Sequence, residues 1–406
     1  MTAKKVPKLR FPEFNDEWGS RKIKDLGEIA TGTTPRTSNK NNYGGEHLFV
    51  SPADITNNLR YVRFTNKSLS AEGFTKSRSV RTGATLFVCI GSTIGKVAQA
   101  GKQLATNQQI NAVIANDNFD NDFVYSLLVR KSSKIASLAA IQAVPLISKS
   151  NFQNIKVITP GLSEQQKIAD FLTAVDDKIS ALQTKKELLE KYKKGVMHHL
   201  FSREIRFSED SGQSYPDWSM SKMEEVFKEI KDKVGERNIE TYSITAGEGF
   251  VSQKEKFGKD ISGKQNDKYT VLGPGNFSYN KGNSKTYMYG CIYPNLTDRQ
   301  IAVPNVFISF KLLDSSFNSS FFAKLFEDHY LDRQLRRIIS SSARMDGLLN
   351  VSKRYFFQLK IPVPHPNEQQ KIADFLTSLD DKIKLMERKL QQAERFKKGL
   401  LQQMFI

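Results

Sequence analysis

The sequence has few cysteines and no long apolar segment. Cys89 and Cys291 are the only cysteines among 406 residues. Two cysteines are too few for a disulfide framework, and their separation fits no metal-ligand spacing. No apolar run approaches the roughly 18 residues that a membrane-spanning helix requires, and the first residues, MTAKKVPKLRF, lack the apolar core of a secretory signal. We therefore expect a protein of the reducing cytoplasm.

Acidic residues are scarce relative to basic ones. The chain has 61 Lys and Arg residues against 43 Asp and Glu residues, which gives a formal net charge of +18. A charge of this size favours a polyanionic partner, and nucleic acid fits it better than a membrane surface. Improved solubility is the alternative explanation.

Motifs for catalysis and nucleotide binding are missing as well. The segment GSTIGKV (Gly91–Val97) resembles a phosphate loop, but three residues separate its glycines instead of four, and Val97 stands where the loop needs Ser or Thr. Asp217, Glu229 and Lys231 match a nuclease pattern only formally. The sequence has no DPPY-like or NPPF-like motif of an amino-methyltransferase, and its five histidines form no ligand cluster. We predict a non-catalytic chain with no metal site and no cofactor of its own.

The most informative feature that is present is a repeat. The decapeptide EQQKIADFLT occurs at Glu164–Thr173 and again, unchanged, at Glu368–Thr377. After each copy the segments DDKI and KKG recur at the same spacing, and each repeat contains one of the two tryptophans, Trp18 or Trp218. A globular stretch followed by a long helix therefore occurs twice.

The order of the repeat is circular. KLRF at 8–11 resembles EIRF at 204–207, so the segment that follows the first helix has its counterpart at the start of the chain. This order suits a molecule with pseudo-two-fold symmetry. It predicts that the two termini lie near each other.

Each copy of the decapeptide begins a predicted helix of about 38 residues, or about 57 Å at 1.5 Å per residue. Ser163 and Asn367 precede the two copies as candidate N-cap residues, and the glutamines that follow complete a capping-box pattern. Apolar residues then recur with the alternating spacing of a heptad seam.

The seam predicts that the two helices pair with each other in antiparallel orientation; packing of each helix on its own globular half is the alternative. The predicted pairing residues are Val175, Ile179, Leu182 and Leu189 in the first helix and Leu379, Ile383, Met386 and Leu390 in the second. Lys186 interrupts the first seam.

The globular halves share an order of elements but little sequence, and each is predicted to be α/β (α+β). Strands are predicted at 84–91, 110–115, 275–282 and 301–310, and helices at 121–140 and 318–340. The predicted organisation is a globular domain at 1–157, a helix at 158–202, a second globular domain at 203–361 and a second helix at 362–406.

Contact with DNA requires cations for phosphates and amides, hydroxyls and arginines for base edges. Such residues gather in predicted loops at 32–42, 106–111 and 279–285. The candidate DNA-binding residues are Arg36, Ser38, Asn39, Lys40, Lys96, Asn107, Gln108, Gln109, Lys264, Lys268, Tyr279, Asn280, Lys281, Ser284, Lys285 and Arg344. Each of them, taken alone, also fits an ordinary polar loop.

Two diverged globular halves, each ended by a P…EQQKIADFL helix with a DDKI segment, resemble the specificity subunit (S, or HsdS) of type I restriction–modification systems. The resemblance covers essentially the whole chain. It implies two pseudo-symmetric target recognition domains, joined by two long helices that form an antiparallel coiled coil. Each domain would read one half of a bipartite DNA site through the major groove. The helices would set the distance between the half-sites, which is about 34 Å for each turn of DNA.

The resemblance also implies partners. Two modification (methyltransferase) subunits would dock on the helices, and restriction (endonuclease and translocase) subunits would complete the complex on double-stranded DNA. S-adenosylmethionine, ATP and Mg²⁺ would bind to those partners and not to this chain. Two alternatives stay open: the recognition part of a single-polypeptide restriction–modification enzyme, and a coiled-coil scaffold with nonspecific affinity for DNA.

Overall fold

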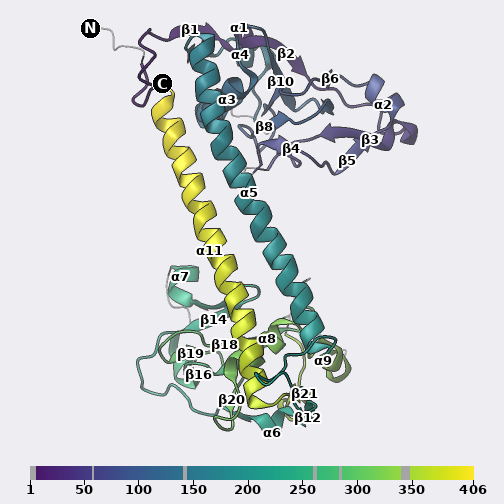
Figure 1. The fold of residues 1–406 in the computed structure, drawn as a ribbon, viewed down its shortest axis with the longest axis vertical. Helices are drawn as coiled ribbons and strands as arrows, with labels where there is room; N and C mark the ends of the chain where they lie inside the picture. The colour runs from purple at the N-terminus through teal and green to yellow at the C-terminus, as the bar shows by residue number, and fades with distance from the viewer. Residues whose placement is uncertain (1–5, 57–58, 140–143, 259–262, 283–285, 340–347) are drawn as a thin grey trace. The chain divides into compact units, whose positions relative to one another are not determined.

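The chain forms two compact units in a computed structural model (Figure 1). The first unit comprises Met1–Lys186 and Met386–Ile406, and the second comprises Glu187–Leu385. The structure describes all residues except 1–5, 57–58, 140–143, 259–262, 283–285 and 340–347.

Two long helices contribute to both units. Helix α5 spans Leu162–Phe201 and helix α11 spans Pro366–Met404, so both lie inside the segments predicted for them. At 1.5 Å per residue each is about 60 Å long. Within the part of the chain that the structure describes, no helix has both the length and the apolar composition needed to cross a membrane.

The first unit contains a five-stranded sheet in the order β2-β10-β7-β8-β4 and a four-stranded sheet in the order β5-β3-β9-β6, and β1 pairs with β11. Its elements before α5 are β1 (Gly19–Lys22), α1 (Ile23–Leu26), β2 (Gly27–Thr31), η1 (Lys40–Asn42), β3 (Tyr43–Val50), β4 (Tyr61–Val62), β5 (Lys67–Leu69), α2 (Ala71–Thr75), β6 (Ser79–Val80), β7 (Thr85–Val88), β8 (Val97–Ala100), β9 (Leu104–Thr106), β10 (Ile110–Ala115), α3 (Asn121–Ala136), α4 (Lys149–Gln153) and β11 (Lys156–Thr159).

The second unit contains a four-stranded sheet in the order β13-β20-β17-β18 and the strand pairs β12-β21, β14-β15 and β16-β19. Its elements between the long helices are β12 (Ser219–Lys222), α6 (Met223–Val226), β13 (Phe227–Glu229), β14 (Tyr242–Thr245), β15 (Gly249–Ser252), α7 (Gln253–Phe257), η2 (Gly263–Lys268), β16 (Thr270–Leu272), β17 (Phe277–Asn280), β18 (Cys291–Pro294), β19 (Ile301–Val303), β20 (Ile308–Leu312), α8 (Ser319–Glu327), α9 (Asp332–Ile338), α10 (Lys353–Phe357) and β21 (Lys360–Val363).

The two units share one antiparallel framework. Strands β2, β10, β7 and β8 of the first unit correspond to β13, β20, β17 and β18 of the second, in the same order. The central strand β7 (TLFV) is mostly apolar, whereas β17 (FSYN) alternates aromatic and polar residues, and all of these residues except Asn280 are buried. The first unit adds β4, which pairs with β8 in parallel.

The duplicated decapeptide places a buried carboxylate at the start of each long helix. In the first unit, Arg10 binds Glu164 through two hydrogen bonds of 2.7 Å, and the indole nitrogen of Trp18 donates to the same carboxylate at 3.3 Å. In the second unit, Arg206 donates to Glu368 at 3.2 and 2.9 Å. Glu164 is 3% exposed and Glu368 is completely buried. Such a charge is tolerated in the interior only when its partners surround it.

Trp218 completes the second arrangement, because its indole nitrogen donates to Glu368 at 2.8 Å. The arginine and the tryptophan therefore come from the segments KLRF and EIRF and from the two tryptophan positions that the sequence matched. Leu9 donates a backbone hydrogen bond to Gln403 at 2.9 Å, which confirms that the beginning and the end of the chain lie together within the first unit.

The next residue of the decapeptide connects each long helix to a helix of the globular part. Gln165 accepts a hydrogen bond from the backbone of Asp120 at 3.1 Å and donates to the Pro160 carbonyl at 3.0 Å. Asp120 is the N-cap residue of α3. Gln369 makes the same two contacts, with Asn318 and Pro364, at 2.9 Å each.

The capping-box prediction was wrong in its details. Helix α5 begins at Leu162 and α11 at Pro366, so Ser163 and Asn367 lie inside the first turn and not at the N-cap. Proline is favoured at the first helical position because its missing N–H has no partner there in any case.

Within each unit the helices run antiparallel. In the first unit, Asp176 of α5 pairs with Lys397 of α11 at 2.5 Å, and Lys186 pairs with Glu387 at 3.0 Å, so residue numbers rise along one helix as they fall along the other. Lys186, which breaks the apolar seam, therefore takes part in an ion pair. The eight predicted pairing residues are all buried or half-buried.

One predicted helix is two helices in the structure. The segment 318–340 forms α8 and α9, and His329 between them has a φ of 58°, in the left-handed region. A helix cannot continue through that conformation. The strand predicted at 301–310 is likewise divided into β19 and β20.

The end of α8 holds a carboxyl group with a displaced pKa. Burial raises the pKa of Asp328 to about 6, although His198 and His329 nearby act in the opposite direction. The Asp328 side chain is 13% exposed. It also lies at the C-terminal end of a helix, where the dipole disfavours a negative charge.

We expect the replacement Glu368→Gln to lower the free energy of unfolding by roughly 1–3 kcal/mol, because it removes the charge that Arg206 faces and keeps the shape. Glu164→Gln is expected to act similarly through Arg10. Thermal denaturation measures both. The control is Glu72→Gln, which breaks the exposed pair between Glu72 and Lys76 and should change stability by less than about 0.5 kcal/mol. Equal effects of all three replacements would contradict the role of burial.

We expect Asp328→Asn to make the protein more stable near pH 7 by about 1 kcal/mol and to have little effect near pH 3, below the pKa of the carboxyl in both the folded and the unfolded state. The sign follows from the raised pKa. The folded state binds this proton more tightly than the unfolded state, so stability falls as the pH rises from about 4 to 6. Chemical denaturation at several pH values measures the difference, and a benefit that is independent of pH would contradict this explanation.

Candidate nucleic-acid interface

The loop between β2 and β3 in the first unit is held by hydrogen bonds on both sides. The Thr34 hydroxyl donates to the side chain of Gln108 at 2.5 Å, and the Tyr43 hydroxyl donates to the Pro35 carbonyl at 2.8 Å. Asn42 is almost completely buried and donates to the carbonyl of Arg36 at 3.0 Å. The backbone on both sides of Arg36 is therefore fixed.

This fixed loop presents several of the predicted DNA contacts to solvent. The side chains of Arg36, Ser38 and Lys40 are exposed. Asn39 is half-buried, because its carboxamide accepts the backbone N–H of Asn41 at 3.1 Å and caps η1. A cation, a guanidinium and a hydroxyl on an ordered backbone can contact phosphates and base edges without a further loss of loop entropy.

The turn between β9 and β10 lies against this loop, but its amides differ in availability. Gln108 is exposed and keeps its N–H₂ group free of the bond to Thr34. Asn107 donates to Gln109 at 2.9 Å, and Gln109 donates to the Ile90 carbonyl at 3.2 Å. The amides of Asn107 and Gln109 thus connect the turn to the segment after β7, whereas Gln108 points outward.

The turn GSTIGKV brings Lys96 to the same region. Gly91 and Gly95 have φ values of 102° and 93°, which only glycine adopts readily. The Lys96 ammonium is half-buried and donates to the Pro52 carbonyl at 3.3 Å. The structure therefore joins the predicted contacts of the first unit into one surface, which consists of the loop 32–42 and the turns 91–96 and 107–109.

The predicted contacts of the second unit are more scattered. Lys268 is exposed in η2. Asn280 is half-buried at the end of β17, where its side chain accepts the Gly282 N–H at 2.9 Å. Lys281 is also half-buried. Ser284, Lys285, Arg344 and the side chain of Lys264 lie outside the described residues.

The prediction that Tyr279 contacts DNA was wrong. Its side chain is completely buried and its hydroxyl donates to the Tyr289 carbonyl at 2.7 Å. Its ring stacks on Phe356 with 5.0 Å between centroids. Tyr279 belongs to the hydrophobic core and has no surface with which to contact DNA. The alternation along β17, which places Tyr279 on the face opposite to Asn280, was the signal that the sequence offered.

Sequence reasoning missed a residue that holds the loop 32–42 in place. Arg78 donates its backbone N–H to the Thr33 hydroxyl at 2.8 Å and its guanidinium to the Thr31 carbonyl at 2.9 Å. It therefore supports the loop 32–42 from the neighbouring β6 region. Its position in the sequence, far from any predicted contact, gave no indication of this role.

The other residues that were considered for chemistry are two buried thiols and a carboxylate in an ion pair. Burial raises the pKa of the Cys89 thiol to about 12 and that of Cys291 to about 11, so neither thiol ionises at neutral pH. Glu229, from the formal nuclease pattern, pairs with Lys353 at 2.5 Å. Among the described residues, no group of His, Cys, Asp and Glu has an arrangement that could hold a metal ion.

Comparisons with known proteins agree with the internal repeat. The model of the type I restriction modification DNA specificity domain matches twice, at residues 15–191 and 207–395. The MjaVIII specificity subunit of Methanocaldococcus jannaschii is 23% identical over 419 residues, which cover 98% of this chain and 93% of that protein. The MjaIX specificity subunit of the same organism is 27% identical over 225 residues, about half (52%) of each chain.

A solved structure gives the same result for the fold. The crystal structure of the type I restriction–modification S subunit from M. genitalium superposes with a TM-score of 0.60 at 18% identity and covers 99% of both chains. The family model accounts for most of the sequence in two copies, and each copy contains one compact framework with one long helix. The chain therefore belongs to the family of type I restriction–modification DNA specificity subunits, with two target recognition domains.

Proposed function

We propose that each unit reads one half of a bipartite DNA site and that α5 and α11 set the spacing between the two halves. The observation that carries this proposal is the contrast between the two parts of each repeat. The contacts that join each long helix to its globular part are repeated residue by residue, through Glu164 in one unit and Glu368 in the other. The loops that bear cations and amides differ between the two units. Two similar frames with different loops suit the recognition of two different sequences.

The charge of the chain supports the same conclusion. A net charge of +18 provides the phosphate attraction that dominates affinity for DNA. The exposed Arg36, Gln108 and Lys268 supply, respectively, a guanidinium, an amide and an ammonium group at positions that the backbone holds in place. Arginine pairs with guanine and glutamine with adenine in the major groove.

The reaction belongs to other chains in this proposal. Specificity subunits act together with further restriction–modification subunits, so this chain would bind two modification subunits through exposed faces of the long helices, and restriction subunits through the assembled complex. S-adenosylmethionine, ATP and Mg²⁺ would be held by those partners, and the complex would act in the cytoplasm, where the host DNA lies. This chain would provide recognition and spacing without catalysing a step.

Coexpression with a modification subunit that forms a stable complex with this chain tests the proposal. Single-molecule sequencing of the host genome is expected to reveal methylated adenines in a gapped, two-part motif. Exchange of residues 15–155 for those of another family member should change one part of the motif and leave the other part and the gap as they were. A stable complex that modifies no gapped motif would overturn the proposal in favour of a scaffold.

We expect Arg36→Ala to relax the sequence preference at one position of one half-site, at a cost of about 1–3 kcal/mol for the cognate base pair. The reason is that a guanidinium on a fixed loop can bind a base edge with two hydrogen bonds. Competition binding by the complex on a set of single-base variants measures the change.

Lys40→Ala is the matched control for Arg36→Ala, because Lys40 lies on the same loop and its ammonium suits a phosphate. It should weaken binding to all sequences alike and lower the slope of affinity against salt by about one charge. An equal loss for Arg36→Ala on cognate and random DNA would show that Arg36 contacts the backbone.

A further inference from the structure

Asp176 connects three elements of the first unit. This residue of α5 is 9% exposed. One of its oxygens pairs with Lys397 of α11 at 2.5 Å, and the other lies 3.6 Å from Arg60. Arg60 precedes β4 and belongs to the globular part of the unit. A single carboxylate thus faces a cation from the second long helix and a cation from the recognition domain.

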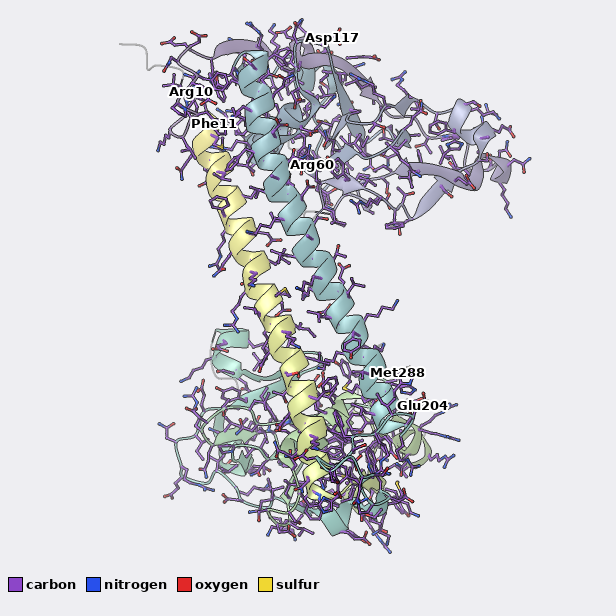
Figure 2. The ribbon with its side chains drawn as sticks, viewed as in Figure 1. Arg10, Phe11, Arg60, Asp117, Glu204 and Met288 are labelled. Carbon is purple, nitrogen blue, oxygen red and sulfur yellow. The ribbon has the colours of Figure 1, made fainter. Side chains whose placement is uncertain are left out.

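Arg60, which Figure 2 shows beside α5, connects the recognition domain to that helix through two hydrogen bonds and an ion pair. Its guanidinium donates to Gln99 of β8 at 2.7 Å and to the Thr173 hydroxyl of α5 at 2.7 Å, and it pairs with Asp122 of α3 at 2.5 Å. The ring of Tyr125 lies 4.9 Å from the guanidinium carbon. The side chain is only 4% exposed. A buried guanidinium has one planar arrangement of donors, so these contacts fix direction as well as distance.

Asp380 is the counterpart of Asp176 in the second repeat, and its partner from the globular part is a lysine instead of an arginine. One of its oxygens pairs with Lys193 of α5 and the other with Lys324 of α8, and both lysines also bind Glu327, at 2.5 and 3.1 Å. Burial acts to raise the pKa of Asp380, but the hydrogen bonds from the two lysines outweigh it, and the pKa is lowered. The carboxylate is therefore charged and paired.

The two frames can be compared position by position. Asp120 and Asn318 are the N-cap residues that Gln165 and Gln369 hold. Counting from these N-caps makes Ser320 the counterpart of Asp122, and Ala323 that of Tyr125. The second unit thus has neither the carboxylate nor the ring that surrounds Arg60 in the first.

A cavity occupies the corresponding space in the second unit. Its volume is about 790 Å³, and its lining includes Ser320, Ala323, Thr377 and Asp380. Pro294 also lines it. This proline stands where β8 has Gln99, because the hydrogen bonds of Gly83 to Ala100 and of Gly275 to Asn295, at 2.8 Å each, align the two strands. In the first unit, Arg60 and Gln99 of β8 thus link the recognition domain to α5. In the second unit, Lys324 makes the link to α11, and a cavity lies beside it.

We propose that Asp176 and Asp380 are positioning residues, which set the number of base pairs that the protein accepts between the two half-sites. This inference rests on the proposed function. One additional base pair turns a half-site by about 34° and moves it by about 3.4 Å. A recognition domain that is tied to both long helices through one buried carboxylate cannot follow that rotation without breaking the ion pair. Because Arg60 makes more contacts than Lys324, the first domain resists the rotation more strongly than the second.

The experiment uses the complex with its modification subunits and three DNA duplexes, which carry the native gap, one base pair less or one base pair more. Asp176→Asn is expected to reduce the preference of methylation for the native gap by about tenfold, a usual size for the coupling of contacting charged residues. Arg60→Lys, which keeps the charge and loses the planar set of donors, should give a smaller reduction. Asp380→Asn should reduce the preference less than Asp176→Asn. The sequences of the half-sites should stay the same in every variant.

Glu72→Gln is the control, since it breaks an exposed ion pair of the same unit and should leave the gap preference unchanged. A merely structural role of Asp176 would lower the activity on all three duplexes by the same factor, and this result would overturn the inference. If Asp176→Asn does not assemble, an unchanged gap preference of Arg60→Lys overturns it. If the wild-type complex prefers one gap and the variants keep the same preference, this inference alone is contradicted. If the wild-type complex modifies no gapped site, the proposed function is contradicted together with this inference.

Discussion

A buried carboxylate at the start of each long helix is the constraint on which the rest of the structure depends. Glu164 and Glu368 are almost inaccessible to solvent, and each pairs with an arginine and accepts a hydrogen bond from a tryptophan, both from segments outside the helix. An unpaired charge at that depth would destabilise the fold by several kcal/mol. In each unit the long helix, the globular part and the segment that carries the arginine, KLRF at 8–11 or EIRF at 204–207, must therefore assemble together. Because KLRF lies at the start of the chain and serves the first helix, while EIRF follows that helix and serves the second, the order of the repeat is circular.

The start of each long helix could be recognised in the sequence as a repeat because its residues have several fixed partners. Glu164 accepts hydrogen bonds from Arg10 and Trp18, and Gln165 makes hydrogen bonds with the backbone of Asp120 and of Pro160. A residue in such a position cannot be exchanged without leaving a buried polar group unpaired. This explains why Glu164 and Gln165 recur unchanged as Glu368 and Gln369. The ion pair of Lys186 with Glu387 was not predicted, because the sequence marks Lys186 only as an interruption of the apolar seam.

The proposed recognition surface is harder to predict from the sequence than the anchoring of the long helices, and the reason is physical. Exposed loop side chains take little part in packing, so no apolar periodicity in the sequence marks them. Tyr279 was selected by composition and belongs to the core, whereas Arg78, which holds the loop 32–42, was not selected. The break at His329 also escaped prediction, because a left-handed conformation at a residue other than glycine depends on tertiary packing and not on local propensity.

The two units show how one frame can carry different attachments. Asp176 and Asp380 occupy equivalent places on the long helices, yet one faces an arginine from the sheet region and the other a lysine from a helix. The central claim is that both units read sequence at once. The affinity of the assembled complex for three duplexes at one fixed salt concentration tests it most directly: the methylated site, and the same site with either half scrambled. The account predicts that scrambling either half alone reduces affinity to nearly that of random DNA. Equal affinity for all three duplexes would contradict it.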